Sequence, residues 1–476
     1  MNDIHRYNFF NNFIVPMTIW IPTLANTAKP LYKKLADAIE QAITDKVLAP
    51  QQKLPPQRQL ADTLGVTIGT ITRGYNEAER RGIVIARVGS GTYVKQQQAS
   101  RYLSPEITEQ AYDLRSANAP MGLQLEMMTL GLAELAAEKN TIKHCLRYQV
   151  EDGMPHQRTN LVNWLSQRDI HCDENQVLFT NGGQHAITLA LNTCCLAGDT
   201  VLAEGLSFPG ISIACQQQQL RCIGLAMDDD GITPTSLLAA IKQSHPRILY
   251  LTAQFQNPTC SQMSLNRKQQ ILSICQQHQL LIIEDDVQFL PYQDKTPSFY
   301  QLDPQSTIYI SSFSKSFSGG LRIGYLITNA TLREKIKLSL RANCWTLPPL
   351  TIELVSRWLS NGKMTQLEHW LAEEMTARNV ILQKELADFE LKFHIHGYNA
   401  WLTLPETWRA VDFVSYAEQH KVLVRAAESY AVGRFPAPQN IRLCVCAPES
   451  KEQLRAALII LKQCLLHINV KNEPIL

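Results

Sequence analysis

The sequence predicts a multidomain protein of mixed α+β and α/β class: a small helical domain ending in a β-hairpin, then a large domain with a mainly parallel sheet. Three observations lead to this prediction. The chain of 476 residues is too long for one ordinary hydrophobic core. Residues 29–95 hold eleven Lys and Arg against six Asp and Glu, which places the basic surplus near the N-terminus. Beyond residue 113, short apolar runs alternate with helix-length segments.

Composition limits the class of protein. A hydrophobic content of 45% with 18% charged residues is typical of a soluble globular protein. The twelve cysteines include no CxxC pair, so reduced thiols and a cytoplasmic location are expected. The apolar stretch 9–21 is short and broken by polar residues and Pro16, so it resembles neither a signal peptide nor a membrane span.

The first 28 residues are interpreted as a leader or disordered arm. Met17 opens a more ordinary start, so residues 1–16 are either an upstream translation artefact or a disordered leader. Mass spectrometry of the native N-terminus distinguishes the two.

Residues 29–95 are predicted to form a winged helix-turn-helix. Apolar residues at four-residue spacing from Leu31 predict a helix after Pro30. A second helix is predicted over 57–64, closed by Gly65, and a third opens at Thr67 as its N-cap. Residues 83–94 then read as two strands that turn near residues 89–91.

Polar side chains in this segment suit DNA. Small residues let a helix N-terminus approach base edges, and arginines reach bases or phosphates. The alternative is that the arginines only solvate a small helical domain. The candidate DNA-binding residues are Arg58, Thr67, Thr70, Arg73 and Arg87.

The motifs resemble the GntR family of bacterial regulators. They run in the family's order: Leu54-Pro55-x-x-Arg58-x-Leu60-Ala61, Leu64-Gly65-Val66-Thr67, and Gly89-Ser90-Gly91-Thr92. The resemblance implies that operator DNA is a partner. Many GntR proteins carry an arginine where this chain has Ile68, so any DNA contact made by that arginine is in doubt here. Arg58 and Arg73 are therefore the more important candidates.

A Gln-rich linker, residues 96–112, is predicted to join this domain to a large domain over 113–476. Five short apolar runs in the large domain predict strands, with ligands at their carboxyl ends. The predicted strands are 177–180, 200–203, 248–252, 280–283 and 307–310, and helices are predicted over 184–196 and 267–279.

Lys315 is the central candidate. It follows the last predicted strand among serines and glycines, with Arg322 seven residues on. A lysine that attacks a carbonyl works best when partly desolvated near other cations, and hydroxyls with a guanidinium suit a phosphate. The pattern indicates a Schiff-base lysine beside a phosphate pocket. The plainer alternative is a Ser-rich strand end with a solvated lysine.

Other candidates also follow predicted strands. Residues 181–184, Asn-Gly-Gly-Gln, open a helix whose N-terminus can face an anion. Phe208 suits stacking on a flat ring, although a core role fits it equally by itself. Asn257 offers an amide to a phenolic oxygen, and Asp285 offers a carboxylate that can keep a pyridine nitrogen protonated.

In this order the motifs resemble the fold-type I aminotransferases, and together with the GntR-type segment they resemble the MocR family of transcriptional regulators. The resemblance implies pyridoxal 5'-phosphate (PLP) as cofactor, bound to Lys315 as a Schiff base (aldimine). It implies that Asp285 meets the pyridine nitrogen, Asn257 the ring hydroxyl, and Phe208 the ring face. The implied phosphate-binding residues are Gly182, Gly183, Gln184, Ser312, Ser314 and Arg322.

Two further roles are implied by the same resemblance. Tyr148 resembles a tyrosine that reaches the phosphate from the partner subunit, which implies a head-to-tail homodimer. Arg442 matches the arginine that grips a substrate carboxylate, although an ordinary strand arginine remains the alternative.

Two departures from the family pattern bear on catalysis. Fold-type I sites usually place a tyrosine two or three residues after the acid, where this chain has Val287 and Gln288. The usual Asn-Pro-Thr-Gly turn ends here in Cys260, so a glycine expected to serve a tight turn is absent. We therefore expect impaired turnover with cofactor binding retained.

The sequence thus favours a cytoplasmic DNA-binding regulator, nucleoid-associated when bound, that senses PLP or an amino compound through Lys315. The alternative is a functional PLP-dependent aminotransferase with an appended DNA-binding domain. A third possibility is a large domain that only dimerises the DNA-binding heads. No metal site is expected, because His394 and His396 have no acidic or thiol partner at ligand spacing.

Overall fold

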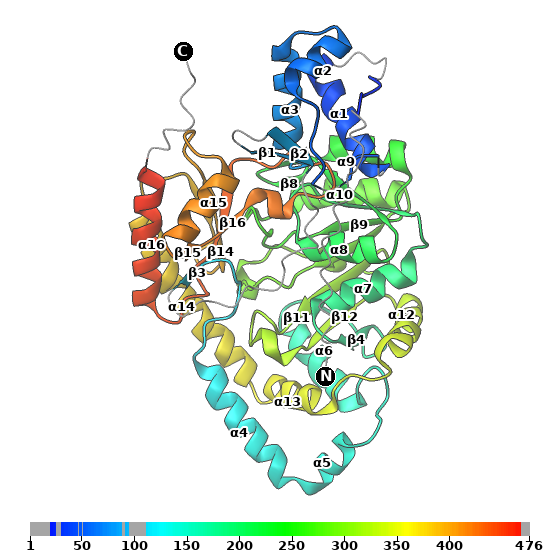
Figure 1. Ribbon diagram of the computed structural model, residues 1–476. Coiled ribbons are helices and arrows are strands. Elements are labelled where there is room, and N and C mark those ends of the chain that lie inside the picture. The colour runs from blue at the N-terminus through cyan, green and yellow to red at the C-terminus, as the bar shows by residue number, and fades with distance from the viewer. Residues whose placement is uncertain are drawn as a thin grey trace, which may run out of the picture. The chain divides into compact units, whose positions relative to one another are not determined.

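The computed structural model describes residues 20–24, 30–45, 47–49, 51–87, 91–94 and 111–467 (Figure 1). The chain divides into two compact units, Met1–Pro105 and Glu106–Leu476. Their boundary falls inside the predicted linker. Most of the predicted leader and linker lie outside the described residues.

In its described residues, the first unit contains three helices and an antiparallel hairpin. Its elements are α1 (Leu31–Thr44), α2 (Gln57–Leu64), α3 (Ile68–Arg80), β1 (Val84–Arg87) and β2 (Gly91–Val94). Thr67 caps α3 as predicted, because its side chain accepts a hydrogen bond from the backbone N–H of Thr70. Trp20 and Leu24, inside the predicted leader, pack against the core of this unit.

The second unit is built on a seven-stranded sheet. In spatial order its strands are β4 (Val177–Thr180), β12 (Gly324–Ile327), β11 (Thr307–Ser312), β10 (Leu281–Asp285), β9 (Ile248–Leu251), β5 (Thr200–Glu204) and β6 (Arg221–Leu225). The strands run parallel except β12, which is antiparallel to both of its neighbours. The five predicted strands are all present, one with the predicted bounds and the others with bounds that differ by at most two residues, whereas β6 and β12 were not predicted.

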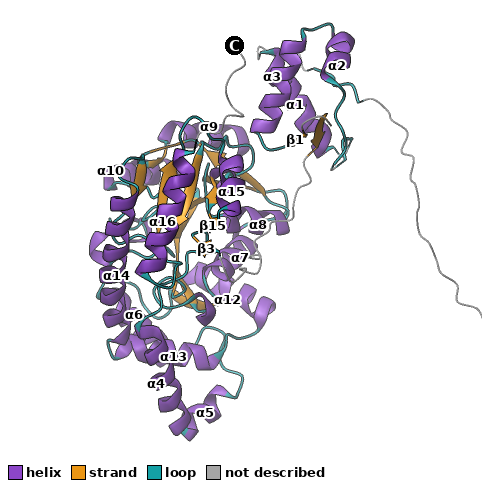
Figure 2. Ribbon diagram, turned by 60° about the vertical axis from the view of Figure 1, so that its left-hand side comes forward, coloured by secondary structure: helices purple, strands orange, loops and turns teal. Residues whose placement is uncertain are grey.

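Helices flank this sheet (Figure 2). The helices that contact its strands are α6 (Pro155–Ser166), α7 (Gly183–Cys194), α8 (Pro209–Gln217), α9 (Pro234–Ser244), α11 (Phe299–Leu302) and α12 (Ala330–Cys344), and α10 (Leu265–Gln277) packs against α9 and α11. Farther from the sheet, α4 (Leu123–Ala137), α5 (Lys139–Cys145) and α13 (Pro349–Ser360) pack against one another. Both helices that the sequence predicted in the large domain, α7 and α10, are present. Because β4, β5 and β9 are buried along their whole length, their continuous apolar runs reflect cover on both faces.

A second, antiparallel sheet follows toward the C-terminus, with the order β13 (Leu391–Phe393), β14 (Asn399–Thr403), β17 (Asn440–Cys444) and β16 (Arg425–Ala426). The associated helices are α14 (Lys363–Glu385), α15 (Ala410–Gln419) and α16 (Lys451–Leu466), and α14 packs against α16. The remaining short elements are β3 (Tyr112–Asp113), β7 (Met227–Asp228), β8 (Gly231–Ile232), β15 (Val422–Leu423), η1 (Tyr292–Asp294), η2 (Gly319–Leu321) and η3 (Ala427–Tyr430). None of the helices in the described part of the chain is long and apolar enough to cross a membrane.

Candidate functional site

Lys315 lies three residues beyond the end of β11 and is half-buried. Its ammonium donates a hydrogen bond to the backbone carbonyl of Ala117. Burial lowers the pKa of Lys315; the nearby thiols of Cys446 and Cys444 oppose this, and Arg442 and Arg322 add to it. The lysine is therefore more easily deprotonated than a surface lysine, as an amine nucleophile requires.

Two serines precede the lysine in the same turn. The Oγ atoms of Ser312 and Ser314 lie 2.8 Å apart within hydrogen-bond distance, and the backbone N–H of Ser314 donates to Ser312 Oγ at 3.1 Å. These contacts fix the turn that carries Lys315.

Gly182 and Arg322 form a cradle at the start of α7. Gly182 has φ +83°, and a Cβ added to it would meet Nη2 of Arg322 at 2.8 Å. Nη2 of Arg322 also donates to the carbonyl of Asn181 at 2.9 Å. The guanidinium thus lies against the glycine turn at a helix N-terminus, and both features favour an anion.

The side chains of Gln184 and Phe208 both lie against Gly210. Nε2 of Gln184 donates to the Gly210 carbonyl at 3.0 Å. A Cβ added to Gly210 would meet Oε1 of Gln184 at 2.0 Å and the Phe208 ring at 2.2 Å. Because both side chains lie directly against Gly210, any side chain at that position would displace the ring or the amide.

Asp285 ends β10 and is buried. The hydroxyl of Tyr250 donates to its Oδ2 at 2.5 Å, and the backbone N–H of Val287 donates to its Oδ1 at 3.0 Å. Burial raises the pKa of Asp285 to about 6, although both hydrogen bonds oppose this shift. The carboxyl is therefore mostly ionised at pH 7 and can hold a proton on a neighbouring ring nitrogen.

Asn257 and Arg442 are in direct contact. Nη1 of Arg442 donates to Oδ1 of Asn257 at 2.9 Å, and its Nη2 donates to the carbonyl of Arg115. The Nε of Arg442 is buried and has no hydrogen-bond partner among the described residues. A buried donor without a partner is costly, so an acceptor placed at this atom would be stabilising.

The structure shows the residues of both departures from the family pattern. Val287 replaces the expected hydroxyl with an apolar side chain, and its Cγ2 lies 2.7 Å from the position of a Cβ on Gly183. Gln288 accepts a weak hydrogen bond from Asn399 at 3.4 Å. Cys260 has φ +61°, the left-handed conformation that a glycine adopts without strain.

Tyr148 does not join this cluster within the chain. It follows α5 and is 87% exposed. Its predicted role depends on a second subunit.

The candidate DNA-binding residues are mostly exposed on the first unit. Arg58 lies on α2 and Arg73 on α3, where its Nε donates to the Gly69 carbonyl at 3.3 Å. The hydroxyls of Thr67 and Thr70 lie 2.9 Å apart at the start of α3. Arg87 ends β1, and its side chain lies outside the described part of the chain.

Comparison with known proteins matches both units to families. Residues 31–94 match the model of bacterial regulatory proteins of the gntR family, and residues 116–461 match the aminotransferase class I and II model. An uncharacterized HTH-type transcriptional regulator from Bacillus subtilis, YdeF, is 30% identical over 96% of this chain and 98% of its own length. The probable rhizopine catabolism regulatory protein MocR of Rhizobium meliloti is 23% identical over 86% of each chain.

The chain belongs to the aminotransferase class I and II family, in the MocR-type arrangement. It is a transcriptional regulator with an aminotransferase-like domain, as the sequence predicted. The GntR-type helix-turn-helix indicates DNA as its partner.

Solved structures show that the large domain of this MocR-type regulator has the fold-type I aminotransferase fold. LysN, an α-aminoadipate aminotransferase from Thermus thermophilus complexed with a phosphopyridoxyl-leucine, superposes with a TM-score of 0.67 at 22% identity, covering 76% of this chain and 93% of LysN. The kynurenine aminotransferase of Pyrococcus horikoshii, in complex with PMP, has a TM-score of 0.68 at 18% identity, with 75% and 91% coverage. Family and fold together support pyridoxal phosphate as the cofactor.

The residues present fit that cofactor. The glycine turn and Arg322 suit its phosphate, ionised Asp285 suits its pyridinium nitrogen, and half-buried Lys315 suits its aldehyde. The partnerless Nε of Arg442 leaves a donor for a carboxylate beside them.

Sequence reasoning missed several residues that hold the site. Tyr250 contacts Asp285, the hydroxyl of Tyr398 donates to the Lys315 carbonyl at 2.5 Å, and Ala117 accepts from the Lys315 ammonium. Cys444 was also missed: burial raises the pKa of its thiol, but Cys446, Arg442 and Lys315 together hold it below its usual value. No local motif marks Tyr250, Tyr398 or Ala117, because their partners are distant in sequence.

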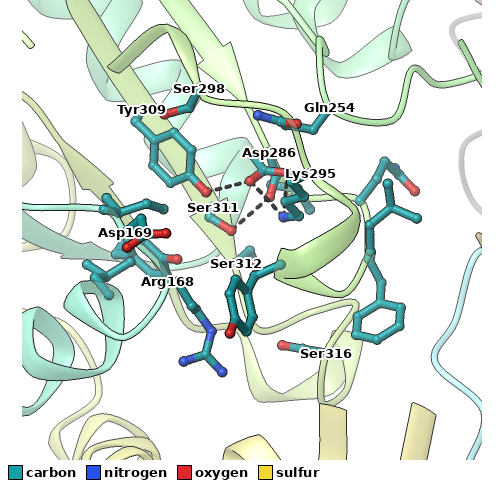
Figure 3. A pocket seen from close by; sticks show the side chains of 18 of the residues that line it. Arg168, Asp169, Gln254, Asp286, Lys295, Ser298, Tyr309, Ser311, Ser312 and Ser316 are labelled. Carbon is teal, nitrogen blue, oxygen red and sulfur yellow. Dashed lines mark hydrogen bonds and ion pairs between the residues drawn. The ribbon is translucent and has the colours of Figure 1, made fainter. Parts of the chain in front are cut away.

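A cavity of about 180 Å³ lies next to this site (Figure 3). Ser312 and Val287 line it, but Lys315 and Asp285 do not. Within it the carboxylate of Asp286 binds the Lys295 ammonium at 2.7 Å and accepts from the Tyr309 hydroxyl at 2.5 Å. Since Lys315 and Asp285 do not line the cavity, it is a neighbour of the cofactor site and not the site itself.

Proposed function

We propose that this MocR-type protein carries pyridoxal phosphate on Lys315 and senses the cofactor or an amino compound there, changing how its N-terminal unit binds operator DNA. One observation carries the proposal. The half-buried Lys315, with its lowered pKa, lies at the carboxyl ends of the strands beside the Asp285 carboxylate and the Arg322 anion cradle.

The bound cofactor would supply an aldehyde that condenses with amines and a ring that absorbs visible light. Arg322, the N-terminus of α7 and the Ser312–Ser314 turn would hold the phosphate, since they form an anion-favouring cradle. Asp285 would keep the proton on the ring nitrogen, and Phe208 would cover one ring face. Asn257 would position the ring hydroxyl.

Arg442 is proposed to select the effector. Its guanidinium is buried, is held by Asn257 and Arg115, and has its Nε free of a partner among the described residues. A fixed guanidinium recognises a carboxylate in a planar, paired geometry. An amino compound with a carboxylate therefore fits better than a simple amine.

The proposed assembly is a cytoplasmic, head-to-tail homodimer in which Tyr148 reaches the partner's cofactor phosphate. The exposure of Tyr148 in the single chain is compatible with such a contact. We propose that residues 29–95 bind DNA, residues 96–112 link them to the cofactor-binding residues 113–476, and residues 1–28 form a leader.

The alternative, a working aminotransferase, is favoured by the presence of both Lys315 and Asp285, close enough that the lysine's charge lowers the pKa of the carboxyl. Against it stands Val287, whose apolar side chain packs toward Gly183 where a phenol is expected. Without that hydroxyl, the proton balance at the reacting amine shifts, so turnover falls more than binding does. Multiple turnovers with an amino donor and a keto acid would establish the enzyme instead.

The covalent attachment is tested on the full-length protein. We expect purified protein mixed with pyridoxal phosphate to gain a visible absorbance band. After borohydride reduction, peptide mass spectrometry should place the modification on Lys315. Lys315→Ala should lose both signals, while Lys335→Ala, which alters an exposed lysine of α12, should keep them. Attachment to other lysines only would overturn the proposal.

A further inference from the structure

Two histidines and an aspartate meet at a place away from Lys315 that the sequence did not reveal. One ligand atom from each of Asp294, His394 and His396 lies within 4.8 Å of the other two, and all three residues are half-buried. Asp294 ends η1, and the histidines lie between β13 and β14. The acidic partner that the sequence lacked near His394 and His396 is thus supplied from about 100 residues earlier.

The segment that carries the histidines is held by its backbone. The buried Asn379 of α14 donates to the carbonyls of Ile395 at 2.8 Å and Gly397 at 2.9 Å. The N–H of Gly397 donates to the His394 carbonyl at 2.9 Å. These bonds fix the backbone turn that carries both histidines, and they do so without a ligand.

The aspartate is held in the same way. Nε2 of Gln262 donates to the backbone carbonyl of Asp294 at 2.7 Å, which leaves the carboxylate available. The nearest lysine in sequence, Lys295, binds both oxygens of Asp286 at 2.8 and 2.7 Å. The described interaction of the Asp294 carboxylate is with Nδ1 of His396 at 2.5 Å.

We propose that Asp294, His394 and His396 form a binding site for a divalent first-row transition metal ion, with Zn²⁺ as the best fit. Two imidazole nitrogens and one carboxylate oxygen are the ligand set of such ions, with water completing a tetrahedron, whereas Ca²⁺ and Mg²⁺ prefer oxygen ligands. Metal–ligand bonds of about 2.0–2.1 Å imply ligand atoms about 3.3 Å apart. The Asp294–His396 contact would open by less than about 1 Å to admit the ion.

The surroundings agree with this assignment. The Phe255 ring lies edge-on to His394 with 6.3 Å between the ring centroids, which limits solvent on that side.

The ion would join the segment after β10 to the second sheet. Asp294 belongs to the stretch that follows Asp285, and the histidine turn continues into Tyr398, whose hydroxyl holds the Lys315 carbonyl at 2.5 Å. A bound metal would therefore stabilise the large unit against unfolding, because it binds only the folded arrangement.

Equilibrium dialysis of full-length, chelator-treated protein against Zn²⁺ tests the site. We expect one tight Zn²⁺ per chain, and a rise in melting temperature on binding. His396→Gln and Asp294→Asn each remove a ligand. The Zn²⁺ affinity of each variant should therefore fall by more than the roughly 10–100-fold that is typical when a hydrogen bond to a ligand is lost. His278→Gln, which alters an exposed histidine at the end of α10, is the matched control and should bind as the original protein does.

Because the chain has twelve cysteines, Co²⁺ substitution identifies the ligands. We expect visible d–d bands without the near-ultraviolet charge-transfer bands of thiolate ligands, and loss of the visible bands in His396→Gln. Absence of tight binding, binding unchanged in both ligand variants, or thiolate bands alone would overturn the proposal. The first of these outcomes would leave Asp294 and His396 as a simple ion pair.

Discussion

The hydroxyl of Tyr250 donates a 2.5 Å hydrogen bond to Oδ2 of Asp285, joining the middle of β9 to the end of β10 inside the sheet. Both residues are buried. The bond stabilises the ionised carboxylate and so opposes the effect of burial on the pKa of Asp285. Tyr250 therefore helps to keep the carboxylate charged at neutral pH, where it would hold a pyridinium proton.

Replacing Tyr250 by Phe should raise the pKa of Asp285 further above 6, because the charged form loses a donor. We expect cofactor affinity at pH 7 to fall by roughly tenfold, since a hydrogen bond to a charged group contributes about 1.5–3 kcal/mol. The loss should shrink as the pH rises and the carboxyl ionises again. Spectroscopic titration of the apo protein with pyridoxal phosphate across pH measures both effects.

Tyr309→Phe provides a matched control for this experiment. Its hydroxyl donates to the neighbouring Asp286 at the same 2.5 Å, and Asp286 is paired with Lys295. We expect cofactor affinity to change little in this variant. Equal losses in the two variants, or a Tyr250→Phe loss that is the same at every pH, would contradict the role given to Tyr250.

The part of the site that the sequence predicted is the part that follows strand ends. Gly182, Asp285 and Lys315 each lie just after a short apolar run, and parallel strands bring their carboxyl ends to one edge of a sheet. Their positions at this edge could therefore be predicted from local patterns.

The contacts that fix those residues could not be predicted in this way. Tyr398 is 83 residues from Lys315, and Ala117 is 198 residues from it. Such pairs depend on how the second sheet and the segment before α4 pack on the first sheet, and a single sequence has no periodic signal for that packing. For the same reason, the sequence did not predict that Asp294 lies next to its two histidine partners.

Arg442→Lys should separate effector recognition from cofactor binding. Lysine keeps the positive charge but loses the paired donors, so we expect affinity for amino acids to fall at least tenfold, equal to about 1.4 kcal/mol. Affinity for pyridoxal phosphate and for amines without a carboxylate should change little. Spectral titration with an amino acid and with its decarboxylated amine makes the comparison. Equal losses for both ligands would contradict carboxylate recognition.

Glu204 predicts a specific pH dependence of stability. It is buried at the end of β5 and accepts hydrogen bonds from Thr252 and Gln256. Burial raises its pKa to about 7 from the usual 4.5, so the folded state favours the protonated form. Stability from this group is full below about pH 4.5 and is lost as the pH rises to about 7.

Glu204→Gln should remove this loss of stability with rising pH. Relative to the original protein, the free energy of unfolding of the variant should rise by up to about 3 kcal/mol between about pH 4.5 and 7.5. Urea unfolding of the cofactor-free protein at a series of pH values measures this. The exposed Glu406→Gln is the control and should show no trend. A Glu204→Gln difference that is constant across pH would exclude the assigned titration.

Arg73→Ala tests the DNA-binding face of the first unit. The residue is exposed on α3, so we expect weaker operator binding, and a phosphate contact would reduce the slope of log affinity against log salt by about 1. Arg80→Ala is the control on the same helix, because its guanidinium is bound to Glu77 at 2.8 and 2.9 Å. If Arg73→Ala leaves the DNA affinity and its salt dependence unchanged, the DNA interface lies elsewhere.

The link between Lys315 and DNA is tested most directly by fluorescence anisotropy with the protein's own upstream DNA, measured with and without pyridoxal phosphate. We predict that the cofactor changes the DNA affinity of the original protein and of Lys335→Ala by about 5-fold or more, the lower end of typical coupling between two sites. Lys315→Ala should show no change on adding the cofactor. An original protein that binds DNA equally well with and without cofactor, or a Lys315→Ala variant that responds in the same way as the original, would contradict the account.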